Sequence, residues 1–208
     1  MDILWQCVTD PSQLGRLVRL AVTSEVINLE DANKTRLPAW ATEAVKIENY
    51  DLNWISQGIH EVQELLSLLS SFGVDEVEHI GSTSIPALPS KPILDLMASI
   101  ASYDRISELT ESLETHHWYY VPPELDNRAW RRFFIKVENN KRVAHLHLML
   151  KGEPRWEQQL QFRDRLKRNP ALISDYANLK RDLAAKFGND REAYSKSKAA
   201  FIEHVLRM

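Results

Sequence analysis

Residues 77–100 read VEHIGSTSIPALPSKPILDLMASI, and this stretch predicts two strands, 77–80 and 93–100, joined by a loop. The first strand runs into the turn Gly81-Ser82, and three prolines in the loop prevent a helix there. A Gly-Ser turn lets backbone N–H groups and a hydroxyl approach phosphate oxygens, while Asp95 on the second strand can hold a divalent cation against them. The stretch therefore indicates a phosphate and metal site, although Gly-Ser turns and lone strand carboxylates also occur without one.

The pattern on either side of this stretch predicts an α+β fold, a mixed β-sheet with packed helices and a helical C-terminal layer. The other elements expected before residue 153 are a helix over 54–72 ended by Gly73, a helix over 104–115, and strands over 118–121, 132–137 and 143–150. From Glu153 onward the pattern is helical, and Pro170 and Gly188 divide it into three helices, with Asp190 capping the last. Because the strands cluster instead of alternating with helices, α+β is favoured over a doubly wound fold.

The composition is that of a globular protein, with 44% apolar and 26% charged residues. The net charge of −3 gives no support to a broad electrostatic nucleic-acid binder. Cys7 is the only cysteine, which excludes an internal disulfide and a four-cysteine zinc site. No apolar run reaches membrane-spanning length and the start lacks a basic leader, so we expect a cytoplasmic protein without a membrane partner.

Two histidines, His145 and His147, lie two residues apart on the strand expected over 143–150. Strand geometry points both to one face, while Leu146, Leu148 and Leu150 point to the other, where burial is expected. Paired imidazoles can bind a metal, bind phosphate when protonated, or act as an acid and base pair. The alternative is a structural pair that is hydrogen-bonded to its neighbours.

Asp95 lies between two leucines, so its carboxylate needs a partner on the sheet face. That partner is either a metal ion or a cation such as Lys91, which is also close enough to reach phosphate itself. His79 precedes Gly81 by two residues, and we interpret it as a structural histidine.

Basic residues outside this stretch are further candidates. Arg131 and Arg132 begin a strand and only one of them can face the histidines; the pattern does not choose, and Arg132 is the candidate taken for ligand binding. Three pairs in the C-terminal helices place a cation on one face by i,i+4 spacing: Arg163 with Lys167, Tyr176 with Lys180, and Tyr194 with Lys198. Such faces are usually solvated. If they turn toward the sheet, they form a basic wall suited to a triphosphate or a nucleic-acid backbone.

With these residues in view, the chain resembles the GrpB family, whose members resemble the nucleotidyltransferase superfamily. The blocks that carry the resemblance are EHIGSTSIPALPSKPILDL at 78–96, AHLHL at 144–148, FRDRLKRNPALISDYANLKRDLAAKFGNDREAYSKSKAAFI at 162–202, and more weakly NYDLNW at 49–54. We therefore expect a nucleotidyltransferase-like domain over 46–208. Residues 1–45 lie outside the resemblance and are expected to form an N-terminal helical extension, with a helix over about 11–30.

The resemblance implies that a Gly-Ser turn holds a nucleoside triphosphate and that a strand with Asp-x-Asp or Asp-x-Glu binds Mg²⁺, often with a third carboxylate from a later strand. Gly81 and Ser82 match the turn, and Asp95 matches the first carboxylate. Met97 stands in place of the second acid, and a thioether does not replace a carboxylate on Mg²⁺. Asp95 with His145 and His147 suits a softer ion, or binding of phosphate without metal.

Several functions follow from this resemblance. The first is a nucleotidyltransferase-like enzyme that uses a nucleoside triphosphate and a divalent metal (Mg, Mn or Zn), with Asp95, His145 and His147 as catalytic and metal-binding residues. The residues expected to hold the nucleotide are Gly81, Ser82, Lys91, Arg132, Arg163, Lys180 and Lys198. The second is a binding module for a nucleotide, coenzyme or RNA end that has lost transfer with the second acid. The third is a metal-dependent phosphoesterase. GrpB-like domains also occur fused to dephospho-CoA kinases, which agrees with a nucleotide-related role.

Overall fold

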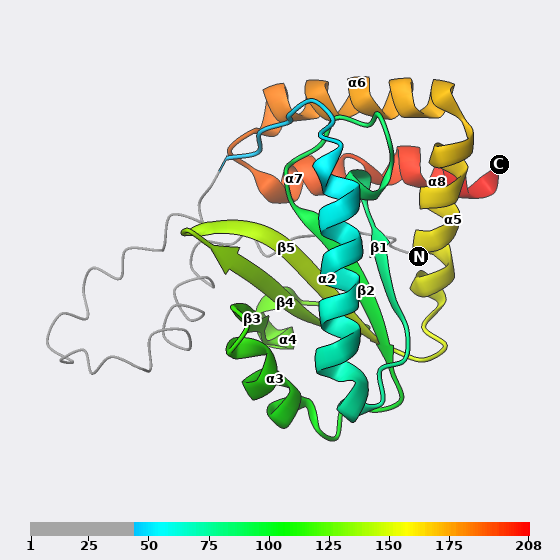
Figure 1. Ribbon diagram of the computed structural model, residues 1–208. Coiled ribbons are helices and arrows are strands. Elements are labelled where there is room, and N and C mark those ends of the chain that lie inside the picture. Colours follow the sequence, from blue (N-terminus) through cyan, green and yellow to red (C-terminus); the bar gives the residue numbers. More distant parts are fainter. Residues whose placement is uncertain (1–43) are drawn as a thin grey trace, which may run out of the picture.

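A computed structural model describes residues 44–208, and the N-terminal helix predicted over 11–30 lies outside the described residues. The described strands form a five-stranded sheet in the order β1-β2-β5-β4-β3, in which β2 and β5 are parallel and the other neighbours are antiparallel (Figure 1). The strands are β1 Val77–Ile80, β2 Leu94–Ile100, β3 Trp118–Val121, β4 Arg131–Glu138 and β5 Lys141–Leu150. The mixed sheet of the predicted α+β fold is confirmed.

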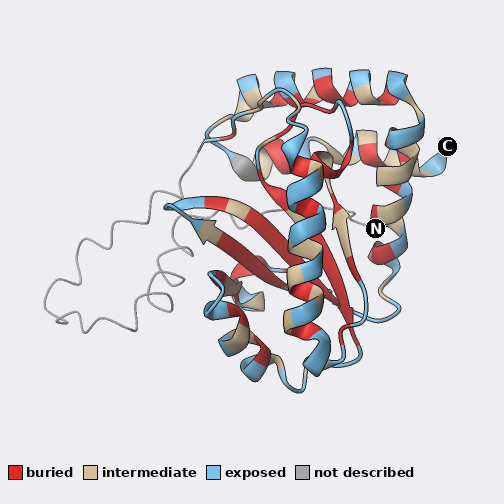
Figure 2. Ribbon diagram, viewed as in Figure 1, coloured by how far each residue is buried: buried red, intermediate tan, exposed pale blue. Residues whose placement is uncertain are grey.

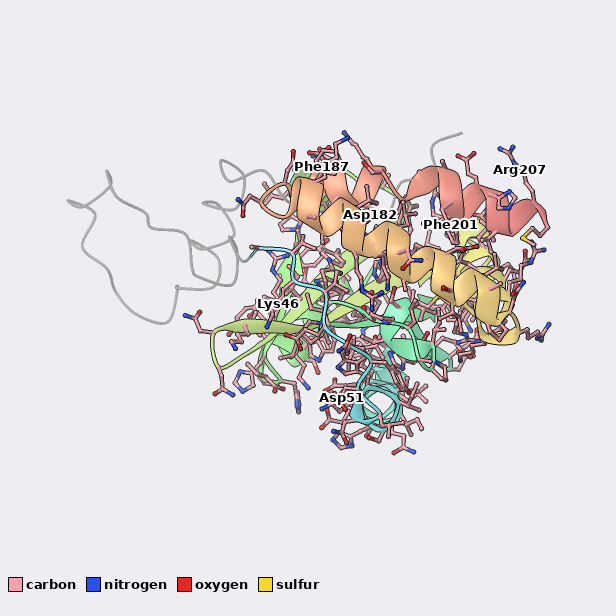
Figure 3. The ribbon with its side chains drawn as sticks, turned by 90° about the horizontal axis from the view of Figure 1, so that it is seen from above. Lys46, Asp51, Asp182, Phe187, Phe201 and Arg207 are labelled. Atoms are coloured by element: carbon pink, nitrogen blue, oxygen red, sulfur yellow. The ribbon has the colours of Figure 1, made fainter. Side chains whose placement is uncertain are left out.

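The helices cover both faces of this sheet. They are α2 Asn53–Leu69, α3 Ile106–Glu114, α4 Pro123–Asp126, α5 Pro154–Arg168, α6 Pro170–Phe187, α7 Arg191–Lys196 and α8 Ala199–Arg207, with single 3-10 turns at η3 Ser70–Phe72 and η4 Ser82–Ser84. Seen from above, α2 lies on one side of the sheet and α6 and α8 on the other (Figure 3). We call the side of α2 and α3 the front face and the side of α5 to α8 the back face. No helix in the described part of the chain is long and apolar enough to cross a membrane.

The C-terminal layer differs in one respect from the prediction of three helices. Asn169 caps α6 by accepting hydrogen bonds from backbone N–H groups, and Asp190 caps α7 in the same way. Both helix breaks therefore lie where the sequence predicts them. Beyond α7, however, the chain turns at Ser197 and Lys198, and the last predicted helix is two helices. The predicted cap at Asp190 is confirmed.

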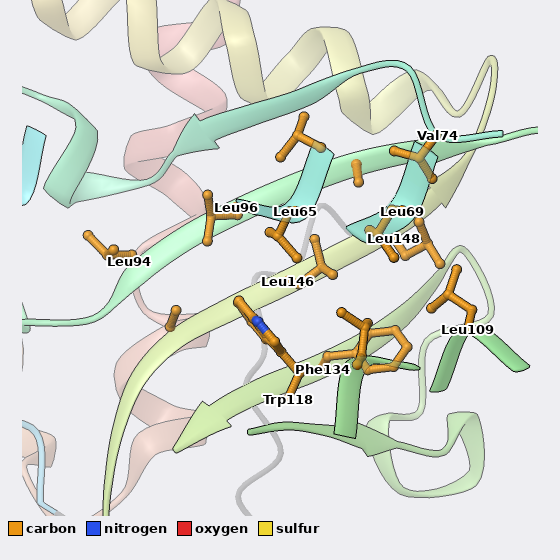
Figure 4. Packing of buried hydrophobic residues seen from close by; sticks show 14 of the residues in the cluster. Leu65, Leu69, Val74, Leu94, Leu96, Leu109, Trp118, Phe134, Leu146 and Leu148 are labelled. Atoms are coloured by element: carbon orange, nitrogen blue, oxygen red, sulfur yellow. The ribbon is translucent and has the colours of Figure 1, made fainter. Parts of the chain in front are cut away.

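The front face carries the main apolar core, in which β2 and β5 meet α2 and α3 (Figures 2 and 4). Leu96, Leu146 and Leu148 are fully buried there, as the alternation of the strands predicts. Burying a leucine side chain stabilises a fold by roughly 1.5–3 kcal/mol. Leu150 is the exception, 41% exposed because it is the last residue of β5. The front face therefore supplies much of the stability of the domain.

Helix α2 packs on the front face through Gly58. A Cβ atom at this position would lie 2.0 Å from Nδ1 of His79, so only glycine allows so close an approach. Ile59 shares a helical spacing with Val62 and Leu66, which predicts burial, but it is 55% exposed because the buried side of the helix passes through Gly58. His79 donates to or accepts from the Thr83 hydroxyl at 3.0 Å. Its position against α2 confirms the structural interpretation of this histidine.

Candidate functional site

A cavity lies on the back face, between the strands and helices α5 to α8. Its floor is formed by residues that alternate with the buried leucines, because neighbours along a strand point to opposite faces. The parallel pairing of β2 with β5 sets Asp95 opposite His145 and Met97 opposite His147. The cavity volume of about 90 Å³ is several times the roughly 10–15 Å³ that one water needs. It therefore has room for a small ligand or part of a larger one.

The Gly81-Ser82 turn lies directly against Asp95. Gly81 has a φ of 68°, and a Cβ atom there would lie 2.5 Å from Oδ2 of Asp95. Glycine is needed both for the backbone conformation and for this contact. Ser82 begins η4 and lines the cavity, while Ser84 Oγ donates to the Gly81 carbonyl at 2.7 Å. The structure thus brings together the turn and the carboxylate of the predicted site.

Asp95 pairs with the first histidine. Its Oδ1 lies 2.9 Å from Nδ1 of His145 and 4.0 Å from Nε2 of His147. Burial opposes ionisation of Asp95, but the hydrogen bond with His145 and the favourable electrostatic interactions with both histidines outweigh it and hold the pKa of the carboxyl well below its usual value. Asp95 is thus an anion at neutral pH, and it orients the imidazole of His145.

The second histidine is held by an arginine. Nη1 of Arg131 contacts Nδ1 of His147, and Asp126 accepts hydrogen bonds from the same guanidinium at 2.6 and 2.8 Å. A guanidinium only donates, so Nδ1 accepts and Nε2 of a neutral His147 carries the proton. Burial, followed by the charge of Arg131, lowers the pKa of His147 to about 4. His147 is therefore a neutral N–H donor at the cavity wall.

Three lysines form the upper wall of the cavity: Lys91 from the loop before β2, Lys180 from α6, and Lys198 at the start of α8. Lys180 is buried and donates to the carbonyl of Pro89. Lys198 and Lys91 lie over the ring of Tyr194, with Nζ 4.5 and 5.5 Å from its centroid. Burial and then the positive charges of Lys198 and Lys91 lower the pKa of Lys180 well below its usual value. The basic wall predicted from helical spacing is present at Lys180 and Lys198.

Two predicted basic residues do not join this wall. Arg132 pairs with Leu148 on the front face, where its guanidinium lies 4.0 Å above the ring of Tyr103. Arg131, one residue earlier, is the arginine that faces His147. Arg163 points to the edge of the sheet, with Nη1 2.6 Å from Glu78. The choice of Arg132 and Arg163 as ligand-binding residues is therefore corrected, because strand register and helix rotation direct both side chains elsewhere.

Other cavity residues had no signal in the sequence. Arg155, Gln158 and Gln159 come from α5, and Trp130 precedes β4. Arg155 is paired with Glu153 at 2.8 Å and lies 4.9 Å from the ring centroid of Trp130. A polar helix face of this kind reads as solvated surface until the position of the helix is known. Only the packing of α5 on the back face identifies these residues.

The described residues do not offer a set of three protein ligands to a resident divalent metal. Within residues 44–208, no three His, Cys, Asp or Glu side chains are arranged to hold a metal ion. His147 has no lone pair to offer, because Nδ1 faces Arg131 and Nε2 is protonated. Met97 is fully buried beside it, at the position of the second acid. Asp95, His145 and His147 come together as predicted, but as they are arranged they do not form a three-ligand metal centre.

Comparisons with known proteins identify the family of the chain and support its fold. A family model described as GrpB protein matches residues 44–208. YqkA of Bacillus subtilis (strain 168), a UPF0157 protein, is 34% identical over 159 residues, which are 76% of this chain and 45% of YqkA, so the chain spans less than half of that relative. The crystal structure of GrpB from Enterococcus faecalis has a TM-score of 0.69 and 29% identity, covering 78% of this chain and 95% of that one. A structure of the Cid1 poly(U) polymerase has a TM-score of 0.43 and 14% identity, covering 65% of this chain and 45% of that one.

Proposed function

The chain belongs to the GrpB family, and we propose that it binds a phosphate-bearing small molecule, a nucleotide in the first instance, in the back-face cavity. The proposal places the phosphate groups against the lysine wall and the Gly81-Ser82 turn. The cytoplasmic location expected from the sequence is part of the same proposal.

The observation that carries this proposal is the charge of the cavity wall. Lys91, Lys180 and Lys198 converge there, and Asp95 is the carboxylate among the lining residues of the described chain. Burial, followed by the positive charges of Lys198 and Lys91, disfavours the charged form of Lys180 in the folded protein. A bound phosphate reverses this, because each ammonium then gains a charge-assisted hydrogen bond in a partly desolvated site. The cavity is therefore complementary to an anion.

The turn adds a second group that suits phosphate. The space beside Gly81 is taken by the Asp95 carboxylate, but Ser82, the next residue of the turn, lines the cavity, where its polar groups can bind a phosphate oxygen. One of the two residues that match the superfamily's triphosphate turn thus faces the cavity that holds the lysines. This agreement favours a nucleotide over an isolated inorganic anion.

A nucleotidyltransferase-like enzyme is the second candidate, favoured by the hydrogen bond between Asp95 and His145. A carboxylate that fixes the tautomer and orientation of an imidazole is the arrangement that general bases use. In this candidate mechanism His145 accepts the proton of an acceptor hydroxyl, the hydroxyl oxygen bonds to the α-phosphorus of the nucleoside triphosphate, and the bond from that phosphorus to the departing pyrophosphate breaks while the lysines stabilise the phosphate charge. Loss of nucleotide turnover in Asp95→Asn, with binding of the nucleotide retained, is the result that this candidate requires.

Isothermal titration of ATP, CTP, GTP, UTP and tripolyphosphate, each with and without Mg²⁺, tests the proposed binding. Lys180→Met should weaken binding about 10-fold or more, because one charge-assisted hydrogen bond contributes roughly 1.5–3 kcal/mol. Lys186→Met is the matched control, since this lysine is exposed on the same helix α6. Equal affinities in the two variants, or no binding of any of these anions to the wild-type protein, would overturn the proposal.

A further inference from the structure

Two buried side chains of the cavity wall have polar atoms without a hydrogen-bond partner among residues 44–208. They are Nε2 of His147 and Oε1 of Gln159, and the two residues are 6% and 7% exposed. Both residues line the cavity, His147 from β5 and Gln159 from α5. Buried polar atoms in folded proteins are almost always hydrogen-bonded, so a pair of such atoms at one cavity indicates a group that the protein is built to receive.

The hydrogen-bonding roles of this pair are opposite. Arg131 donates to Nδ1 of His147, and the carboxylate of Asp126 fixes that guanidinium through two hydrogen bonds, so Nε2–H is a fixed donor. Oε1 of Gln159 is an acceptor, and its amide forms no hydrogen bond with any described residue. One buried donor and one buried acceptor thus belong to the same cavity.

We propose that His147 and Gln159 bind a hydroxyl group of the ligand whose phosphate lies on the lysine wall. A hydroxyl accepts from His147 and donates to Gln159 through a single oxygen, which satisfies both atoms. A second phosphate or a carboxylate would bind only if the amide of Gln159 turned its N–H group inward, whereas a hydroxyl satisfies both atoms as they stand; an ammonium group would meet the guanidinium of Arg131 beside His147. This inference rests on the proposed function, and it makes the ligand a phosphate ester of a hydroxyl-bearing sugar.

The sugar hydroxyl has two possible sources, the ribose of a nucleotide or a free sugar phosphate, and a titration distinguishes them. The probes are ATP against 2′,3′-dideoxy-ATP, ribose 5-phosphate against inorganic phosphate, and tripolyphosphate, which has no hydroxyl. We expect the wild-type protein to prefer at least one hydroxyl-bearing probe over its partner about 10-fold. Preference in the first pair identifies a nucleotide, and preference in the second pair alone identifies a sugar phosphate.

Gln159→Leu, which has nearly the same shape, should abolish this preference and leave the affinity for tripolyphosphate unchanged. Gln161→Leu is the matched control on the exposed side of α5 and should keep the preference. If tripolyphosphate binds but Gln159→Leu retains the preference, the inference is wrong and the proposed function stands. If none of the probes binds, both are wrong.

A second measurement needs no variant. The ¹⁵N chemical shifts of His147 report which ring nitrogen carries the proton. We expect the Nε2–H tautomer in the unliganded protein at neutral pH, and a change at Nε2 when the preferred probe is added. The Nδ1–H tautomer would overturn the assignment of His147 as the donor.

Discussion

The two faces of strands β2 and β5 differ sharply in the residues that they carry. On the front face, Leu96 and Leu146 are fully buried in an apolar core. One residue away, Asp95 and His145 line a charged cavity on the back face. Because strand neighbours alternate, one segment of sequence supplies both the stability of the fold and its candidate chemistry.

The back face is not arranged for stability. It holds a buried lysine repelled by two others and a histidine with a polar atom that lacks a partner in the described chain. Such groups reduce the stability of a fold, and they persist at sites that bind something. The apolar core on the front face offsets this loss of stability. Changes on the two faces should therefore have different consequences.

The largest effect is expected on the front face. Leu146→Ala should lower the free energy of unfolding by about 2–5 kcal/mol, because it leaves a cavity in the packed core. Leu150→Ala, at the exposed end of the same strand, should change it by only about 0.5 kcal/mol. Chemical denaturation measures both. Similar losses in the free energy of unfolding of the two variants would contradict the distinction between the core and the end of the strand.

The next largest effect is the pH dependence of stability that arises from one histidine on each face. Burial lowers the pKa of both His79 and His147 from 6.5 to about 4. Between these values the unfolded chain binds more protons than the folded protein, so the free energy of unfolding falls as the pH falls from 6.5 to 4. The loss is roughly 3 kcal/mol per histidine at the acid end. Denaturation as a function of pH measures this slope.

The same two histidines show on which face of the sheet a ligand binds. In an NMR titration with ATP, the signals of His147 should shift and those of His79 should not, because of these two histidines only His147 lines the cavity. An equal response of the two histidines would contradict the assignment of binding to the back face.

Two glycines give a smaller and sharper test. Gly73 and Gly81 both have positive φ, but a Cβ atom at Gly73 would meet nothing within 4 Å, whereas at Gly81 it would meet Asp95. Gly73→Ala should cost about 1–2 kcal/mol of stability for the left-handed backbone alone. Gly81→Ala should cost more and also weaken ATP binding, because Asp95 must move. Unchanged ATP affinity in Gly81→Ala would show that the Gly81-Ser82 turn does not contribute to nucleotide binding.

The smallest effect on stability is expected at Lys180. Lys180→Met removes a buried ammonium that Lys198 and Lys91 repel, but it also removes the hydrogen bond to the Pro89 carbonyl, so the free energy of unfolding at neutral pH should change by only about 0.5 kcal/mol while anion binding weakens. The folded protein releases this proton below the usual pKa of 10.5, so wild-type stability rises with pH up to that value. Denaturation of the variant should show a flatter dependence. A strongly destabilised Lys180→Met would show that the ammonium is structural.

The sequence predicted the parts of the site that depend on local rules. Alternation along a strand placed His145 and His147 on one face, and helical spacing singled out Lys180 and Lys198. The choice between Arg131 and Arg132 depends on the register of β4 against β5, which no local rule determines. The role of Gln159 depends on how α5 docks, and that is decided by long-range packing.

A crystal structure of the protein soaked with ATP tests the central claim most directly. We predict electron density for ATP in the back-face cavity, with its phosphates between Ser82, Lys180 and Lys198 and a ribose hydroxyl near His147 and Gln159. ATP bound elsewhere on the molecule, or a cavity without ATP at a saturating concentration, would contradict the claim that this cavity is the nucleotide site.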